Sequence, residues 1–222
     1  MLRSALLALA LFAGPLLAQP EGLSPGLTGR VEDRTYVSPT GIFRVAIPVL
    51  PELGGTITDT PNVVTFQDNY NVHVSIGVFA QDASQRWELS TRGLKDYLVY
   101  FFGNYVLPDF RQMYPGGKLE SATFAPGILD GALITFTLLP GGSMFGDKRV
   151  IHGADEPVPV AKRGNLVFVH NGHIFVISTE LAERVTEGRA YQKTTDEEDA
   201  ILRQRLVDLV GKMEFPKPAA GT

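Results

Sequence analysis

The residues best suited to chemistry are two histidines, His170 and His173, on either side of an Asn171-Gly172 pair. If Asn-Gly forms a two-residue hairpin turn, the two imidazoles face each other on adjacent strands. Two imidazoles so placed could share a metal ion if a carboxylate completed the site. The alternative is a solvated pair at the strand ends. The chain has no HExxH pattern and no cysteine ligand, so we predict no metal and no other cofactor, with His170 and His173 as the only candidate ligands.

His73 is a second candidate for chemistry, because Asp68 precedes it in an expected turn. A histidine oriented by a carboxylate is the usual arrangement of a general base. However, no GxSxG pattern marks a nucleophile. We therefore expect His73 to be a surface or partly covered side chain, and we predict no catalytic residue.

The glycine-rich segment 141–146 lacks the GxxxxGK[ST] order of a phosphate-binding loop. Its other residues, Met144 and Phe145, could be presented to a protein partner or an apolar ligand. The alternative is a hairpin tip packed onto the core. Tyr100 is the third candidate contact residue, because it lies off the main apolar stripe of its helix and either packs against the following segment or forms an exposed apolar patch.

The hairpin that carries the two histidines is the strongest structural signal in the chain. Residues 165–178 have the sequence NLVFVHNGHIFVIS. Both central residues of a type I′ turn need positive φ, which Asn and Gly tolerate. The two-residue loop fixes the register, so Val169 faces Ile174 and Phe168 faces Phe175. Both faces are apolar, and we expect the hairpin to lie in the middle of a sheet covered on both sides.

Other apolar and alternating runs predict further strands joined by tight turns. They lie at residues 42–47, 56–58, 63–66, 72–80, 118–124, 132–139 and 148–151. Within 72–80 the alternation predicts one buried face, and 56–58 is expected at the edge of the sheet. The tight turns favour antiparallel pairing.

Two amphipathic helices complete the pattern. The first has an apolar stripe from Leu94 to Tyr105, and Pro108 is expected to stop or kink it. The second begins at a capping box formed by Thr195 and Glu198. One apolar stripe on each helix and a hairpin that is apolar on both faces predict an α+β fold, with an antiparallel β-sheet flanked by helices on both faces.

Length and composition predict one domain behind a targeting segment. Residues 1–18 have one charge, Arg3, then an apolar run and a small residue, Ala18, which is typical of a cleaved secretory signal peptide. We expect a flexible lead-in at 19–35, one α/β sandwich domain at 36–216 and a disordered tail at 217–222. Removing Arg3 leaves 20 − 1 = 19 basic and 24 acidic residues, a charge of −5. This balance argues against binding to nucleic acid or anionic membranes, and no later segment could anchor the chain in a membrane.

Four segments resemble the PsbP-like family, which also includes the Ran-binding Mog proteins. The segment SPTGIFRVAIP at 38–48 is similar to the opening strand of that family, and 131–138 to a strand in mid-domain. The hairpin 165–178 and the end of the last helix, 206–215, are similar to the closing part. The resemblance implies an α/β/α sandwich without a shared catalytic constellation, whose members act as accessory or binding proteins.

Three functions therefore remain open. The first is a non-catalytic periplasmic or secreted accessory protein that contacts another envelope or secreted protein. The second is a carrier of a small apolar ligand. The third is a metal-dependent or hydrolytic enzyme that uses the histidines.

Overall fold

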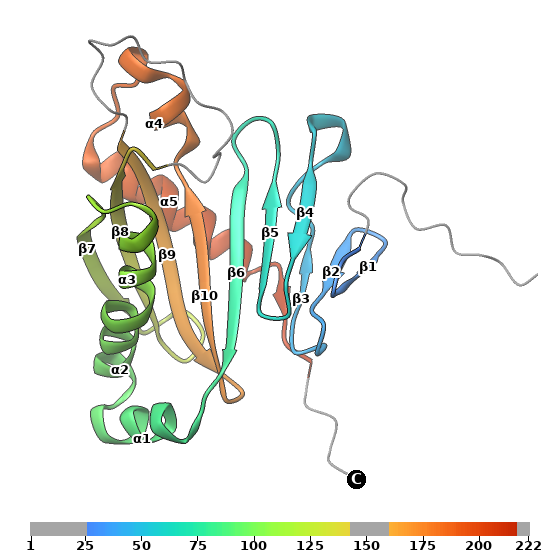
Figure 1. Cartoon of the computed structure of the whole chain (residues 1–222), viewed down its shortest axis with the longest axis vertical. Helices are drawn as coiled ribbons and strands as arrows, with labels where there is room; N and C mark the ends of the chain where they lie inside the picture. The colour runs from blue at the N-terminus through green and yellow to red at the C-terminus, as the bar shows by residue number, and fades with distance from the viewer. Residues whose placement is uncertain (1–25, 143–159, 217–222) are drawn as a thin grey trace, which may run out of the picture.

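The computed structural model describes residues 26–142 and 160–216. Their fold is α+β, as predicted, with two antiparallel sheets (Figure 1). The larger sheet has seven strands in the order β4-β5-β6-β10-β9-β8-β7. Their bounds are β4 Thr56–Asp59, β5 Val63–Gln67, β6 His73–Ala80, β7 Lys118–Ala125, β8 Ala132–Pro140, β9 Val160–His170 and β10 His173–Glu180.

The smaller sheet has the order β1-β2-β3-β11, with β1 Arg30–Glu32, β2 Thr35–Val37, β3 Arg44–Ala46 and β11 Met213–Glu214. The sequence predicted a single sheet, and this second sheet corrects it. Strand β1 also lies inside the segment 19–35 that was expected to be a flexible lead-in, so regular structure begins before Tyr36. The strand β11 is formed by residues that follow the last helix and pair with β3. Local sequence patterns do not predict this long-range pairing.

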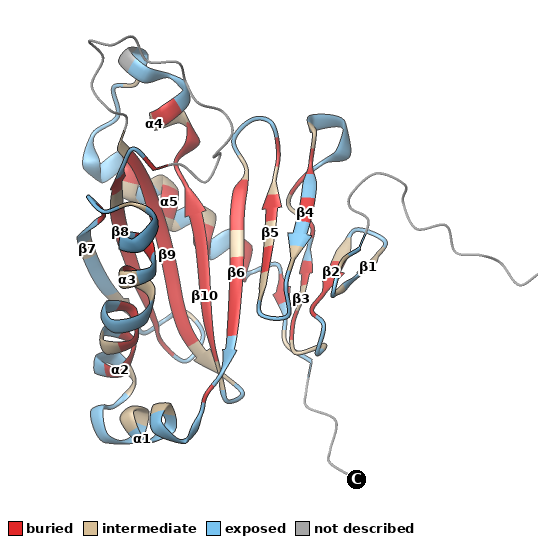
Figure 2. Ribbon diagram, in the orientation of Figure 1, coloured by how far each residue is buried: buried red, intermediate tan, exposed pale blue. Residues whose placement is uncertain are grey.

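The predicted hairpin is confirmed in detail. Asn171 and Gly172 have φ values of 47° and 73°, and Phe168 pairs with Phe175 as the two-residue loop requires. Strand β10 lies between β9 and β6, so the hairpin is in mid-sheet. Both of its faces are buried (Figure 2).

Helices pack on both faces of the larger sheet, as predicted. One face is covered by α2 (Leu94–Phe101), whose Leu98 and Phe101 pack against Val167 and Ile174. The other face is covered by α5 (Thr195–Val210) together with the smaller sheet. The remaining helices are α1 Ala83–Arg92, α3 Leu107–Met113, α4 Ala182–Thr186, the 3-10 turns η1 Pro51–Leu53 and η3 Gly188–Ala190, and the π-helical turn η2 Phe102–Val106.

Pro108 neither ends nor breaks the first helical run. The π-helical turn η2 directly precedes it, and α3 continues to Met113 with the proline in its first turn. A proline has no N–H to donate, and its ring clashes with the preceding turn of a regular α-helix. The wider π turn and the first-turn position accommodate both defects.

The capping box of α5 lies one residue earlier than predicted. Thr194 is the N-cap: its hydroxyl accepts a hydrogen bond from the Glu197 N–H, and the Glu197 carboxylate accepts one from the Thr194 N–H at 2.8 Å. The predicted cap residue Glu198 is buried and shares a helix face with the buried residues Leu202 and Leu206. Packing of that face on the sheet turns Glu198 inward and leaves Glu197 for the cap.

Candidate functional site

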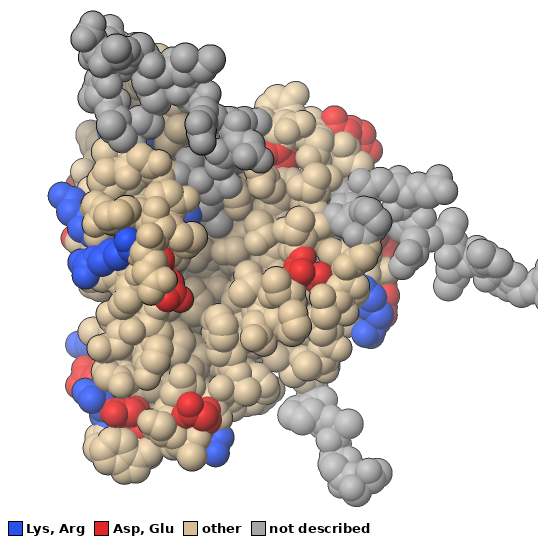
Figure 3. Space-filling view, in the orientation of Figure 1, with Lys and Arg blue, Asp and Glu red and all other residues tan. Residues whose placement is uncertain are grey.

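The described part of the chain contains a groove of about 340 Å³ beside the layer formed by α1, α2 and α3. Its helical wall is aromatic, with Phe101, Tyr105 and Phe110, and its floor is formed by β6 and β10. In Figure 1 the helices stand in front of β7, β8 and β9, and no described helix stands in front of β4, β5 and β6. The groove lies along the boundary between the covered and the uncovered part of the sheet, and the hollow is visible in Figure 3.

The floor is low because Gly77 lies at its centre. Gly77 pairs with Val63 on one side and with Val176 on the other, and all three line the groove. A Cβ atom at Gly77 would lie 3.1 Å from the Phe79 ring, so this ring is folded back over the glycine. Glycine inside a strand often marks a close approach of another group, and here that group is the Phe79 ring.

Aromatic side chains at the mouth of the groove are open to solvent. Phe79 is 37% exposed and Tyr105 is 44% exposed. The Tyr105 ring stacks on Phe101 with a centroid distance of 5.1 Å. Such accessible aromatic surface beside a concave, mostly apolar floor is typical of a binding site.

A row of hydroxyl and amide side chains crosses the sheet at the polar end of the groove. Ser75 pairs with Thr65 and Ser178, Ser178 with Asn165, and Asn165 with Thr135. The buried Asn165 amide donates to the Thr135 hydroxyl at 3.2 Å and accepts from the Ser178 hydroxyl at 2.8 Å. This network fixes the Ser178 side chain, which together with Ser75 lines the groove.

Two hydrogen-bond acceptors complete the lining. Among the described lining residues, Asp109 is the one that carries a charge, and it is exposed in the first turn of α3. The Gln85 side-chain oxygen is shielded from solvent and accepts no hydrogen bond within the described residues. The groove therefore offers aromatic surface with acceptors and one negative charge at its edge.

The predicted contact residue Tyr100 lies behind this wall rather than in it. Its ring meets Tyr105 edge-on at 6.1 Å, and the Arg92 guanidinium lies 4.3 Å from its centroid. Tyr100 is half-buried and supports Tyr105, whereas its neighbour Val99 is exposed. The other two predicted contact residues, Met144 and Phe145, lie outside the described residues.

The two hairpin histidines face each other as predicted. The His170 ring packs on Phe215 with a centroid distance of 4.5 Å, and His173 Nδ1 lies 2.9 Å from the Asn171 carbonyl oxygen. No group of three histidine, cysteine or carboxylate side chains in the described residues is placed to hold a metal ion. The third ligand that the metal hypothesis needs is therefore absent from this part of the chain.

His73 is buried, and the expectation of a surface or partly covered side chain is wrong. Burial, together with the positive charge of Arg163, lowers the pKa of His73 to about 3. The Asp68 carboxylate does not orient His73 as a general base. It accepts hydrogen bonds from the N–H groups of Tyr70 and Val72 and orders the turn. An imidazole with so low a pKa is a poor proton acceptor at neutral pH.

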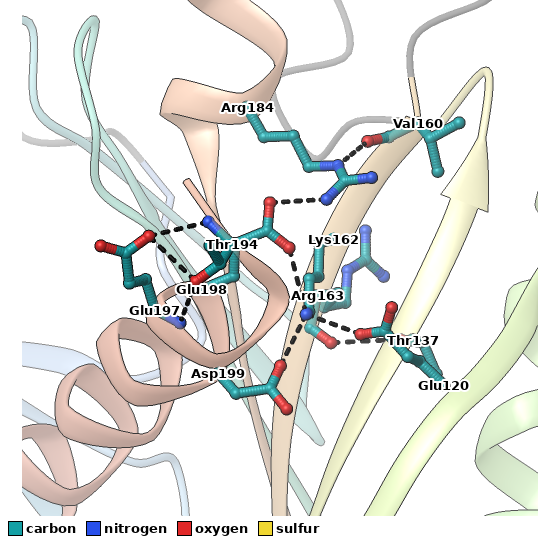
Figure 4. Close-up of polar contacts among 10 residues, drawn as sticks. All are labelled: Glu120, Thr137, Val160, Lys162, Arg163, Arg184, Thr194, Glu197, Glu198 and Asp199. Atoms are coloured by element: carbon teal, nitrogen blue, oxygen red, sulfur yellow. Dashed lines mark hydrogen bonds and ion pairs between the residues drawn. The ribbon is translucent and has the colours of Figure 1, made fainter. Parts of the chain in front are cut away.

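An ion-pair cluster that was not predicted from the sequence lies on the opposite face of the sheet (Figure 4). The fully buried ammonium of Lys162 on β9 lies 2.6 Å from Glu120 and Asp199 and 3.1 Å from Glu198. Glu198 also receives a 2.5 Å hydrogen bond from Arg184. These contacts connect β7, β9, α4 and α5.

Lys162 is a structural cation rather than a nucleophile. Burial by itself lowers the pKa of Lys162, but hydrogen bonds with Asp199, Glu120 and Glu198 outweigh it, and the pKa is raised. A nucleophilic lysine needs the opposite shift, toward the neutral amine. The cluster therefore holds α5 on the sheet.

Comparison with known proteins leaves the function open. No protein-family model matches the chain, and no curated protein matches it by sequence. Among solved structures, cyanobacterial PsbP (CyanoP) from Synechocystis sp. PCC 6803 is similar, with 15% identity, a TM-score of 0.46, and coverage of 91% of this chain and 100% of that chain. A Bacteroides thetaiotaomicron VPI-5482 protein matches with 11% identity and a TM-score of 0.44 over 83% of this chain.

The alignment with the Bacteroides protein spans about half of that protein, 48% of its length. Both TM-scores lie below 0.5, so neither likeness supports an inference about function. The expected resemblance to PsbP has a counterpart in one of these two structures, and the resemblance to Mog proteins has one in neither. Within the described residues, no helix is long and apolar enough to cross a membrane.

Proposed function

We propose that this protein is a non-catalytic binding protein, exported to the periplasm or secreted, that holds a segment of another envelope or secreted protein in the groove beside α2 and α3. The observation that supports this proposal most is the open groove itself, with exposed Phe79 and Tyr105 at its mouth. Aromatic side chains at the edge of a concave apolar surface are frequent anchors of protein contacts. The export part rests on the signal-peptide pattern of residues 1–18.

The chemistry of the lining supports binding rather than catalysis. Its polar groups are Ser75, Ser178, Gln85, Tyr105 and Asp109. Hydroxyl catalysis needs a base within hydrogen-bond reach of the nucleophile. The Ser178 hydroxyl instead donates to the Asn165 amide oxygen, which cannot take up its proton.

Site-specific photo-crosslinking in cells of the source organism tests the proposal. A benzophenone amino acid replaces Phe79 or Tyr105 at the mouth of the groove, and Tyr70, which is also an exposed aromatic residue, serves as the matched control. We expect one defined protein partner to be crosslinked at positions 79 and 105 and not at position 70. No product at either groove position, or the same products at position 70, would contradict the proposal.

A plugged variant links the crosslink to the groove. In Gly77→Leu the new side chain points toward the groove and meets the Phe79 ring, which lies 3.1 Å from a Cβ at this position and is partly exposed. Gly127→Leu is the matched control, because a Cβ atom at Gly127 meets nothing within 4 Å in an exposed turn. We expect the products at position 105 to vanish in Gly77→Leu and to persist in Gly127→Leu.

The groove volume favours a second candidate, a carrier of a small apolar ligand. A volume of about 340 Å³ falls in the range of small-molecule sites. Native mass spectrometry and organic extraction of the purified protein test this candidate. A stoichiometric small molecule, present in the wild type and absent from Gly77→Leu, supports the carrier over the protein-binding role, and an empty protein excludes the carrier.

A further inference from the structure

The chemistry of the groove edge specifies the partner further, on the basis of the proposed function above. We infer that the bound segment is an extended peptide that carries a lysine or arginine next to a large apolar side chain. The apolar side chain packs in the groove against Val176, beside the Phe79 ring that covers Gly77. The basic side chain reaches Asp109 at the edge.

The first observation is the one-sided hydrogen-bonding character of the lining. Asp109 contributes a carboxylate, and Gln85 contributes a shielded amide oxygen that has no donor among the described residues. Neither lysine nor arginine is among the described lining residues. A ligand that brings an N–H donor satisfies the Gln85 oxygen, whereas a ligand with only acceptors leaves it unpaired.

The second observation is the electrostatic environment of Tyr105 at the mouth. A hydrogen bond with Tyr100 and the charges of Asp82 and Glu88 raise the pKa of Tyr105. Glu88 is paired with Arg92 on α1, so the negative charge near the mouth comes mainly from Asp82, the N-cap of α1, and from Asp109 on α3. In Figure 3 the hollow is bordered mostly by uncharged atoms, with acidic atoms at its margin.

The groove has two parts, an apolar row on the sheet and a charged edge on α3. Val63, Gly77 and Val176 form one row across three strands, which is apolar and low. Asp109 and Phe110 follow each other on α3, so the carboxylate adjoins an aromatic wall residue. The Phe110 ring is already contacted by the Arg163 guanidinium, which lies 4.7 Å from its centroid. A basic ligand side chain with a long apolar stem would instead lie along the exposed Tyr105 ring, about one turn before Asp109, and place its charge at the carboxylate. A free carboxylate or phosphate ligand has the wrong sign for this position.

Selection from a phage-displayed library of random nine-residue peptides on immobilised wild-type protein tests the inference. We expect enriched sequences with an aromatic or branched aliphatic residue next to Lys or Arg. Asp109→Lys should weaken binding of the best peptide at least tenfold, and changing the peptide's basic residue to Glu should restore binding to that variant. Asp130→Lys, at an exposed position in the turn between β7 and β8, is the matched control and should bind like the wild type.

Three outcomes separate the charge inference from the groove itself. Peptides whose binding is lost in Gly77→Leu and reversed in sign by Asp109→Lys support both. Peptides lost in Gly77→Leu but without basic residues, and bound equally by Asp109→Lys and Asp109→Asn, overturn the charge inference and leave the groove as the binding site. Peptides that bind Gly77→Leu as well as the wild type, or no enriched peptide, overturn the groove as well.

Discussion

Replacing Lys162 by methionine removes the positive charge from the buried cluster and retains most of the side-chain volume. Three carboxylates then lose their shared cation. Taking one partner out of a buried ion pair costs about 3–5 kcal/mol, because the other charge stays buried and unpaired. Glu198 keeps Arg184, and the side chains of Glu120 and Asp199 are 24% and 28% exposed and can reach water. We therefore expect the lower end of this range, about 3 kcal/mol.

Urea unfolding followed by circular dichroism measures this loss as a shift of the midpoint at constant slope. Lys118→Met is the matched control, because Lys118 is an exposed lysine at the start of β7, and it should change the free energy of unfolding by less than about 0.5 kcal/mol. A double-mutant cycle with Glu198→Gln should give a coupling of about 1–3 kcal/mol. If Lys162→Met is as stable as Lys118→Met, the cluster does not hold α5 on the sheet and the reasoning is refuted.

Three further predictions concern the cap, the packing and the pH dependence. Thr194→Ala should lower the free energy of unfolding by about 1 kcal/mol because it removes the N-cap of α5, whereas Thr195→Ala should cost clearly less, and the reverse order in urea titrations would contradict the observed cap. Gly164→Val should cost more than about 2 kcal/mol and Gly164→Ala less, because a Cβ there already lies 3.1 Å from Leu202 on α5; unchanged melting temperatures would show that the helix is not in contact. Because the folded-state pKa of His73, about 3, lies below its unfolded value near 6.5, the unfolded state binds the extra proton between these pH values. Stability should thus be unaffected above pH 6.5 and fall by about 1.4 kcal/mol per pH unit below it; an NMR titration that gives His73 an ordinary pKa would contradict this prediction.

The parts of the fold that were predictable from sequence are those specified by neighbours along the chain. The hairpin register follows from Asn171-Gly172, since a two-residue turn leaves one pairing for every later residue. The two helical stripes and the strands follow from apolar periodicity in the same way. The capping box was predicted one residue too late because Thr194 and Thr195 are both good caps. Only the packing of Leu202 against the sheet selects between them.

The parts that were missed depend on contacts between distant segments. The strand β9 begins at Val160, five residues before the predicted hairpin. This extension was missed because Lys162 and Arg163 interrupt the apolar pattern and their carboxylate partners lie on other elements. The smaller sheet joins residues near both ends of the described chain. Local periodicity contains no information about either arrangement.

The groove was missed for the same reason. Its walls come from β5, β6, β10 and the segment from α1 to α3, and it exists because the helices leave part of the sheet uncovered. One local signal was present: Gly77 lies inside a regular alternating strand, and a glycine in a strand interior often marks close approach of another group. The predicted contact residue Tyr100 does not line the groove; its ring meets Tyr105 from behind.

The central claim, that a protein partner binds in the groove, is tested most directly by an affinity comparison. Once the partner crosslinked at Phe79 is identified and purified, isothermal titration calorimetry compares its binding to wild type, Gly77→Leu and Gly127→Leu. We predict at least a tenfold weaker affinity for Gly77→Leu, about 1.4 kcal/mol or more, and an unchanged affinity for Gly127→Leu. Equal affinities for all three proteins would contradict the claim.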